Sequence, residues 1–420
     1  MTIKDIRSSI THYPVEIKQH FKDLINIMVD TLQPTAIYLL GSAARGELSW
    51  LQHPSGQLEL FSDLEFAIIT KRRIGPEKCH LMQQQLHNLE NQIANPNPLF
   101  HIDTLFRERR RLRTMPRIIF TFEFKANGLL LYGDDLRSAI PDVTLKNLDQ
   151  RNTNEILYKR LWAILLYLPT SFVHGNPGTE AVRVTGYTLC RNALDLTTVV
   201  LPREGCLLPS YQQRVDFLVE NATHLNLVQE LGFHFPSFMQ TCLERRRDLD
   251  FSAAGLLPPL YTTTIDDLER GLLLLMHTKD TERLPQLSQR IFNTYPISRG
   301  EWYNLLRLML RQARRGDIIN GLRWLHLPVK GWLTLGLLMM HKALICWLKG
   351  QEQDANAYLD RAEHALCALS LSKVPSRDGE FPAQWLALRR AWGEVWWQTV
   401  TLGSASAKAH IERVFAWHYD

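Results

Sequence analysis

The stretch that decides the fold is residues 36–47, which read AIYLLGSAARGE. Its first five residues form a short apolar run that predicts a buried strand, and Gly41-Ser42 end this run in a turn. Glycine lets a backbone approach a ligand closely, and the residues after it can open a helix whose free N–H groups face an anion. Most Gly-Ser turns only change the direction of the chain, so the neighbouring segments decide between the two interpretations.

A second segment, SDLEF at residues 62–66, places two acids in an apolar strand predicted over Leu58–Thr70. Because side chains alternate along a β-strand, Asp63 and Glu65 should project from the same face. Two carboxylates on one face repel each other unless a cation or a proton lies between them, and Mg²⁺ prefers oxygen ligands of this kind. The alternative is an exposed strand face that carries two solvated acids.

A third acid, Asp103, interrupts the apolar segment LFHIDTLF at residues 99–106, which predicts another strand. An acid in such a strand needs a cation, hydrogen bonds or an edge position. Beside Asp63 and Glu65, Asp103 would complete a two-metal site. The ions of such a site hold the attacking and leaving oxygens of a phosphoryl or nucleotidyl transfer.

In this order, GSAARGE, SDLEF and the later acidic strand resemble the nucleotidyltransferase superfamily of the DNA polymerase β type. They look most like its small-substrate and aminoglycoside nucleotidyltransferases. The segment GLLLYGDDLRSAIP at residues 128–141 is similar to the end of such domains. The resemblance covers roughly residues 20–145 and implies an N-terminal mixed sheet with flanking helices.

The resemblance also implies a role for each acid of the motif. Asp63, Glu65 and Asp103 would be the catalytic residues and would bind two Mg²⁺ ions, and Asp103 would complete the site or act as the base toward an acceptor hydroxyl. Gly41 and Ser42 would hold the triphosphate of ATP or another NTP.

Two basic residues are further candidates for nucleotide binding. Arg45 follows the turn closely enough to contact phosphate oxygens, although a surface arginine after a turn is equally ordinary. Lys159 lies on the first helix after the motif-bearing region and could close on the nucleotide across a cleft. Asp63 lies 22 positions after Gly41, about twice the spacing of compact relatives. The intervening His-Pro-Ser-Gly turn predicts a hairpin-like insertion that leaves the carboxylates in place.

After about residue 145 the pattern changes to long amphipathic segments with little alternation. The sequence therefore predicts an α+β chain with three parts: 1–145, a nucleotidyltransferase-like catalytic domain; 146–255, a helical domain that closes the cleft; and 256–420, irregular helix hairpins of a tetratricopeptide-like kind. The clearest predicted helices are Asn154–Leu168, Thr179–Val199, Tyr211–Leu218, Asp266–Met276, Glu301–Ala313, Gly331–Leu348, Asp354–Leu369, Ala383–Thr399 and Ala405–Ala416.

Composition limits the class of protein. With 420 residues, 45% of them apolar and 22% charged, a disordered or low-complexity chain is excluded. The net charge of +5 is mild, and the basic runs at 107–113, 245–247 and 311–315 are too dispersed for a nucleic-acid track, so solvated helix faces are expected. Six scattered cysteines without a CxxC pattern suit a reducing compartment.

Two further features bear on location. The N-terminal residues lack the apolar core of a secretory signal, and we expect a cytoplasmic protein. The most apolar stretch, residues 331–348, is about long enough to cross a bilayer, but it contains His341 and Lys342. It therefore predicts a buried core helix, and no membrane partner is expected.

The sequence as a whole predicts a Mg²⁺-dependent nucleotidyltransferase. It would move a nucleoside monophosphate from an NTP, most naturally ATP, to a hydroxyl or phosphate of an unknown acceptor and release pyrophosphate. The acceptor could be a small molecule, a glycan or a protein, and the C-terminal helices could bind a protein partner. The alternative is a catalytically inactive, nucleotidyltransferase-like scaffold that acts through its helical half.

Overall fold

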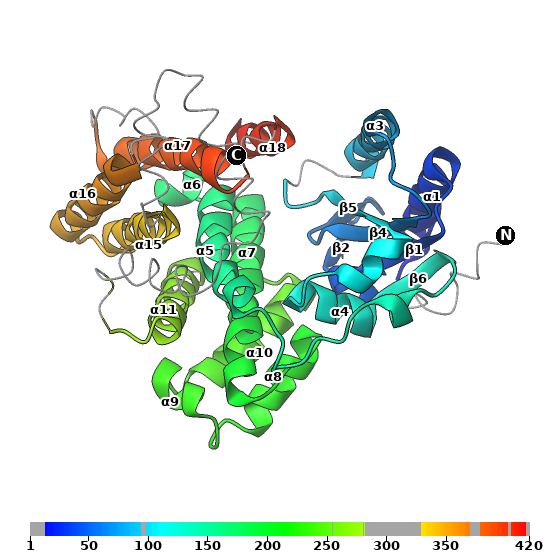
Figure 1. Ribbon diagram of the computed structural model, residues 1–420. Helices are drawn as coiled ribbons and strands as arrows, with labels where there is room; N and C mark the ends of the chain where they lie inside the picture. Colours follow the sequence, from blue (N-terminus) through cyan, green and yellow to red (C-terminus); the bar gives the residue numbers. More distant parts are fainter. Residues whose placement is uncertain are drawn as a thin grey trace. The chain divides into compact units, whose positions relative to one another are not determined.

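The computed structural model describes residues 13–93, 98–253, 255–279, 281, 329–369, 379–401 and 405–416. Over these residues the chain is α+β, with a small mixed sheet in its N-terminal part and many helices after it, as the sequence predicted (Figure 1). The helix predicted over Glu301–Ala313 lies outside the described residues.

The chain packs as two compact units, and each unit joins segments that are distant in the sequence. Unit 1 comprises the described residues within Met1–Thr153, Val200–Leu225 and Pro236–Asp250, and unit 2 comprises those within Asn154–Val199, Asn226–Phe235 and Phe251–Asp420. This division differs from three consecutive domains, because helix α8 (Tyr211–Glu220) and nearly all of α10 (Phe235–Asp248) pack with the sheet-bearing unit.

A four-stranded mixed sheet with the order β5-β4-β1-β6 forms the centre of unit 1. The central strand β1 (Ala36–Leu40) is antiparallel to both β4 (Leu64–Thr70) and β6 (Leu129–Gly133). The edge strand β5 (Ile102–Glu108) runs parallel to β4. Every residue of β1 is buried, which explains why its sequence is a continuous apolar run and not an alternating one.

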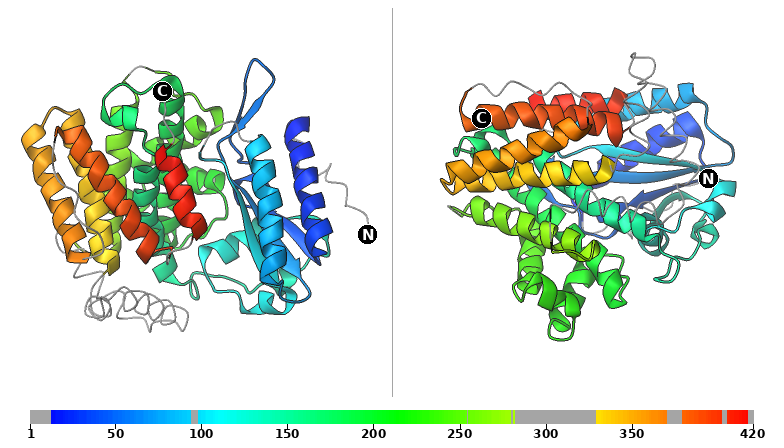
Figure 2. Two further views of the ribbon diagram at one scale, coloured as in Figure 1. Left: turned by 90° about the horizontal axis from the view of Figure 1, so that it is seen from above. Right: turned by 60° about the vertical axis from the view of Figure 1, so that its left-hand side comes forward.

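Both faces of this sheet are covered. Helices α1 (Val15–Leu32) and α3 (Pro76–Ile93) lie side by side against one face, as Figure 2 shows, and Ile37 and Leu39 of β1 point into their core. Tyr38 points to the other face, into a second core that includes residues of α4 (Ile119–Asn127) and of the 3₁₀ helix η1 (Arg109–Thr114).

The strand predicted over Leu58–Thr70 is in fact two strands. β3 (Leu58–Leu60) pairs with β2 (Trp50–Gln52) as an antiparallel hairpin, and residues 61–63 separate β3 from β4. The turn of this hairpin is closed by the Gly56 N–H, which donates to the His53 carbonyl at 2.8 Å. The insertion between Gly41 and Asp63 is therefore a hairpin, as predicted, and Asp63 lies just before β4 and not on it.

Unit 2 consists of helices over its described residues. Consecutive helices α15 and α16 pack side by side along their lengths after a short turn, which agrees with the helix hairpin that the sequence predicted there. The helices are α5 (Gln150–Tyr167), α6 (Thr170–Val173), α7 (Thr179–Val200), α9 (Asn226–Leu231), α11 (Leu257–Leu275), α15 (Val329–Leu348), α16 (Glu352–Leu369), α17 (Phe381–Thr399) and α18 (Ala405–Ala416).

Helix α15 is long and apolar enough to cross a membrane by length and composition, but 72% of its apolar window is buried inside the protein. Its His341 is fully buried, accepts a hydrogen bond from the Tyr261 hydroxyl at 2.6 Å and donates one to the Leu161 carbonyl at 2.9 Å. Burial lowers the pKa of His341 to about 4, although the bond to Leu161 partly offsets this, so the imidazole is neutral. These contacts fit the interpretation of α15 as a core helix.

Candidate functional site

The parallel pairing of β4 and β5 brings the predicted acids together. Glu65 and Asp103 are register partners on the two strands. Asp63 and His101 lie immediately before these strands, where the Leu64 N–H donates to the His101 carbonyl at 3.0 Å. All four polar side chains therefore belong to the same end of the strand pair. That the three acids are catalytic and bind a metal stays a prediction.

His101 lies between two of these acids. Its Nδ1 is 2.8 Å from Asp63 Oδ1, and its Nε2 is 3.1 Å from Asp103 Oδ2. Desolvation alone lowers the pKa of His101, but the charges and hydrogen bonds of Asp63 and Asp103 together raise it well above the ordinary value. The imidazole is therefore a cation held by two carboxylates.

The two acids beside His101 differ in their exposure. Asp63 is buried, whereas 63% of the Asp103 side chain is exposed. The row of contacts from Asp63 through His101 to Asp103 therefore leads from the interior of unit 1 to its surface. An exposed carboxylate at the end of such a row can reach a molecule in solution.

Gly41 and Ser42 lie beside Glu65. Gly41 opens the short helix α2 (Gly41–Ala44) with a φ of +62°, a conformation that favours glycine. A Cβ atom at this position would lie 2.8 Å from Glu65 Oε1, so the Glu65 carboxylate packs directly against the glycine. The Ser42 carbonyl accepts the Glu47 N–H at 2.8 Å, which turns the chain back after α2.

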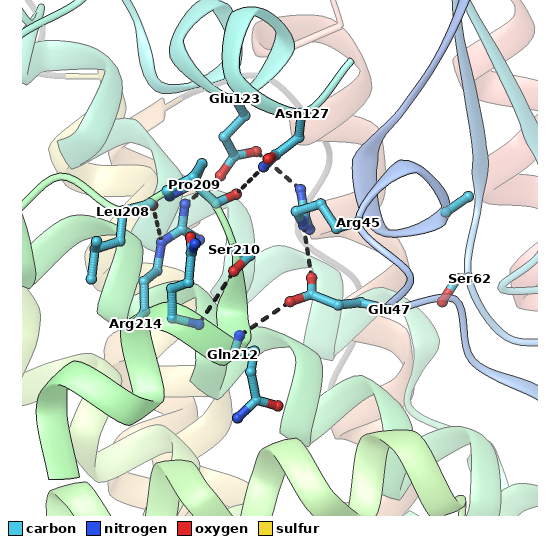
Figure 3. Close-up of polar contacts among 12 residues, drawn as sticks. Arg45, Glu47, Ser62, Glu123, Asn127, Leu208, Pro209, Ser210, Gln212 and Arg214 are labelled. Carbon is cyan, nitrogen blue, oxygen red and sulfur yellow. Dashed lines mark hydrogen bonds and ion pairs between the residues drawn. The ribbon is translucent and has the colours of Figure 1, made fainter. Parts of the chain in front are cut away.

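The structure directs Arg45 toward acids of the protein itself. Its Nε donates to Glu47 at 2.7 Å, and its NH1 lies 3.4 Å from Glu123 (Figure 3). Its guanidinium stands 5.3 Å from the centre of the Tyr211 ring. Burial lowers the pKa of Arg45, but Glu123 and Glu47 outweigh it and raise the pKa above the ordinary value. Arg45 thus holds the turn in place, and its contact with phosphate stays a prediction.

Lys159 belongs to the other unit. It lies on α5, where its Nζ is 3.4 Å from Glu155 one helical turn earlier. The predicted closure of Lys159 on a nucleotide stays a prediction as well.

Arg246 is a residue of this region that sequence reasoning missed. The run 245–247 was expected to be a solvated helix face, which is wrong for Arg246, because only 3% of it is exposed. Its NH1 donates to the Glu47 carbonyl at 2.9 Å, and its NH2 lies 3.4 Å from Ser62 Oγ. Arg246 therefore joins the chain before the β2–β3 hairpin to the residue just before Asp63.

A signal for the burial of Arg246 exists in the sequence. On α10 it follows Met239 and Cys242 at helical spacing, and both of these residues are buried. The position of Arg246 on the apolar face of α10 distinguishes it from Arg247, which is exposed.

A network of charged groups fastens α8 to the same turn. Arg214 pairs with Glu123, and the Gln212 N–H donates to Glu47 Oε1 at 3.1 Å (Figure 3). The guanidinium groups of Arg214 and Arg246 stand 5.7 Å and 5.3 Å from the Tyr211 ring centre, in addition to that of Arg45. Paired and hydrogen-bonded in this way, the buried charges fix the loops that carry Gly41 and Asp63.

The fit of a metal to this site depends on His101. Within the ranges that the structure describes, no three His, Cys, Asp or Glu side chains are arranged so that they could hold a metal ion. The oxygen donors of Asp63, Glu65 and Asp103 suit Mg²⁺ by their chemistry. A Mg²⁺ ion on these donors would have to displace the imidazole from Asp63 and Asp103.

Comparisons with known proteins give a likeness of structure but none of sequence. No protein-family model matches the chain, and no curated protein sequence matches it. Among solved structures, the chain is similar to a spectinomycin adenyltransferase from Enterococcus faecialis, crystallised with ATP and spectinomycin. The identity is 13% and the TM-score 0.38, over 62% of this chain and 99% of that chain. At these values neither fold nor activity is transferred from that enzyme to this protein.

Proposed function

We propose that the protein is a Mg²⁺-dependent nucleotidyltransferase that moves a nucleoside monophosphate from ATP or another NTP to an acceptor and releases pyrophosphate. The observation that carries this proposal is the register pairing of Glu65 with Asp103 on parallel strands, with Asp63 just before β4. The contact of the Glu65 carboxylate with Gly41 adds to it, because it joins the acids to the turn expected to hold the triphosphate.

The proposed reaction assigns a task to each group. An oxygen of the acceptor attacks the α-phosphorus, the bond from this phosphorus to the bridging oxygen breaks, and pyrophosphate leaves with the electron pair. Asp103 either completes the metal site or takes the proton of an acceptor hydroxyl, for which its exposure suits it. The backbone at Gly41 and Ser42 contacts the triphosphate. Mg²⁺ on Asp63, Glu65 and Asp103 would neutralise the phosphate charge.

The position of His101 favours a second candidate function. His101 contacts both Asp63 and Asp103, at 2.8 Å and 3.1 Å, so a basic side chain of the protein itself lies where a metal would bind these acids. A nucleotidyltransferase-like protein of this kind would be catalytically inactive and would act through the helices of unit 2 on a protein partner. The two candidates differ in whether the acids bind Mg²⁺ with a nucleotide.

The proposal also covers the class of acceptor and the location of the protein. A small molecule, a glycan or a protein all offer the hydroxyl or phosphate that the reaction needs. We place the protein in the cytoplasm, where ATP is at hand and the scattered cysteines stay reduced.

Label transfer tests the proposal most simply. ATP labelled at the α-phosphate is incubated with the protein, Mg²⁺ and pools of candidate acceptors, and both labelled product and pyrophosphate are measured. We expect Asp63→Asn and Glu65→Gln to abolish both signals, and Glu77→Gln, an exposed acid on α3, to keep them. Equal activity of the two acid variants and the unmodified protein would place the reaction elsewhere and overturn the proposal.

A further inference from the structure

Two basic runs that are far apart in the sequence meet at one end of the sheet. Because β4 and β5 are parallel and Thr70 is the register partner of Glu108, the residues that follow them leave the sheet side by side. Residues 71–73 are Lys-Arg-Arg, and residues 107–113 read RERRRLR. We call their cations the basic patch, which consists of Lys71, Arg72, Arg73, Arg107, Arg109, Arg110, Arg111 and Arg113.

The basic patch holds more than the whole net charge of the protein. Segments 71–73 and 107–113 carry formal charges of +3 and +4, together two more than the +5 of the entire chain. Their one acid, Glu108, is buried and pairs with Arg110 at 2.6 Å and with Arg111 at 3.4 Å. Of the eight cations only Arg107 is half-buried, and 77% of the Arg110 side chain is exposed.

The composition of segments 71–73 and 107–113 limits the classes of partner that the basic patch could bind. Among the described residues, none of the large exposed apolar side chains lies in segments 71–73 or 107–113. Protein interfaces are usually apolar at their buried centre, and stable membrane anchoring takes a second, apolar signal besides basic residues, so a purely cationic surface favours neither. The two segments also lack an exposed aromatic platform on which single-stranded bases could stack.

Duplex nucleic acid is the kind of partner whose chemistry matches a cluster of exposed arginines. It presents closely spaced phosphates, and the planar guanidinium of arginine, which supplies seven of the eight cations, binds phosphate in a bidentate manner. We propose that the basic patch binds the phosphodiester backbone of a nucleic-acid duplex. DNA and RNA share this chemistry, and the experiment separates them.

The basic patch is distinct from the candidate site. The acids lie at the beginning of β4 and β5, and the basic patch begins where both strands end. At a rise of about 3.3 Å per residue, the six steps from Asp103 to Arg109 span roughly 20 Å. Variants in the basic patch therefore leave the acids unchanged, and the inference does not depend on the proposed function.

Fluorescence anisotropy with the full-length protein tests this inference. DNA and RNA duplexes of equal length are titrated at several salt concentrations against the unmodified protein and the triple variant Arg72→Gln, Arg109→Gln and Arg113→Gln. These exposed side chains are chosen because Arg110 and Arg111 pair with Glu108. The matched control neutralises three exposed cations of unit 2, in Lys279→Gln, Lys349→Gln and Arg390→Gln.

The number of phosphate contacts removed predicts how far the salt dependence and the affinity of duplex binding should fall. Three lost phosphate contacts should reduce the slope of log K against log salt by about 2.7 for duplex DNA, which weakens binding roughly 500-fold at 0.1 M salt if the affinities are equal at 1 M. Each single variant should reduce the slope by about 0.9. The control variant should bind like the unmodified protein, and the tighter duplex identifies the partner as DNA or RNA.

Three results would overturn the inference. The first is the absence of binding to either duplex at low salt. The second is an equal loss of affinity in the patch variant and in the control. The third is tighter binding of polyglutamate, or of vesicles that contain phosphatidylserine, than of both duplexes.

Discussion

Unit 1 and unit 2 each contain a histidine that contacts buried ionisable groups, and the two clusters differ in their access to solvent. In unit 2, His341 and Tyr261 are fully buried and bond to each other, and His341 also bonds to a backbone carbonyl of α5. In unit 1, buried Asp63 is linked through His101 to Asp103, whose side chain is mostly exposed. The His341–Tyr261 pair therefore joins helices of unit 2, whereas the row from Asp63 to Asp103 presents an acid at the surface of unit 1.

The two histidines show the physical origin of this difference. Burial without a neighbouring charge lowers the pKa of His341 to about 4, whereas two carboxylates raise the pKa of His101 well above its ordinary value despite desolvation. The same residue type is thus neutral in one unit and cationic in the other. Burial alone therefore does not set the charge of a buried histidine, because the charges of its partners can outweigh desolvation.

The largest effect is expected from Arg246→Ala, which breaks the charged framework of unit 1. Arg246 donates to the Glu47 carbonyl and to Ser62 and stands over Tyr211, and the loss of these contacts should cost about 4 kcal/mol. Hydrogen exchange should accelerate in the β2–β3 hairpin and in α10, but not in the α15–α16 pair. Arg247→Ala on the exposed face is the control, and an equal effect of both variants would refute the assigned role.

An intermediate effect is expected from acid on unit 2. Because the pKa of His341 falls from 6.5 to about 4 on folding, its contribution is present above pH 6.5 and is lost as the pH falls toward 4. Between pH 7 and pH 5 this amounts to about 2 kcal/mol. Urea unfolding at pH 7 and pH 5 measures this loss as a difference in the free energy of unfolding. In His341→Asn the difference should be smaller by the contribution of His341. An unchanged difference between the two pH values would show that His341 titrates normally in the folded protein.

The smallest difference, and the most local one, is expected between alanine variants of two glycines in unit 1. Gly41→Ala and Gly56→Ala both place a side chain at positive φ, which costs about 1–2 kcal/mol in each case. Only at Gly41 does the new Cβ meet the Glu65 carboxylate, whereas at Gly56 nothing lies within 4 Å. Thermal unfolding should therefore show about 1 kcal/mol more destabilisation in Gly41→Ala. If the two variants are equally stable, Glu65 does not pack against the glycine.

Much of unit 1 could be predicted from local sequence signals. The apolar run at Ala36, the acid in β5 and the turn in the insertion each depend on neighbouring residues, and the structure confirms the strands and the hairpin. The split of Leu58–Thr70 into two strands was missed, because β3 pairs with β2 and not with the main sheet.

Long-range pairing explains what could not be predicted. The link from Asp63 to His101 exists because β5 runs parallel to β4, and the sequence does not contain this direction. The partners of Arg246 lie almost 200 positions earlier in the chain. For the same reason, two basic runs that look dispersed in the sequence meet at the end of one strand pair.

Calorimetry tests the central claim, that the acids at the beginning of β4 and β5 bind a metal and a nucleotide together. A nonhydrolysable ATP analogue is titrated into the unmodified protein and into Asp63→Asn, with and without Mg²⁺. We predict binding at one site that requires Mg²⁺ and weakens at least about tenfold in Asp63→Asn. Binding that is unaffected by Mg²⁺ or by the substitution, or no binding at all, would contradict the claim and leave His101 as the cation that these acids hold.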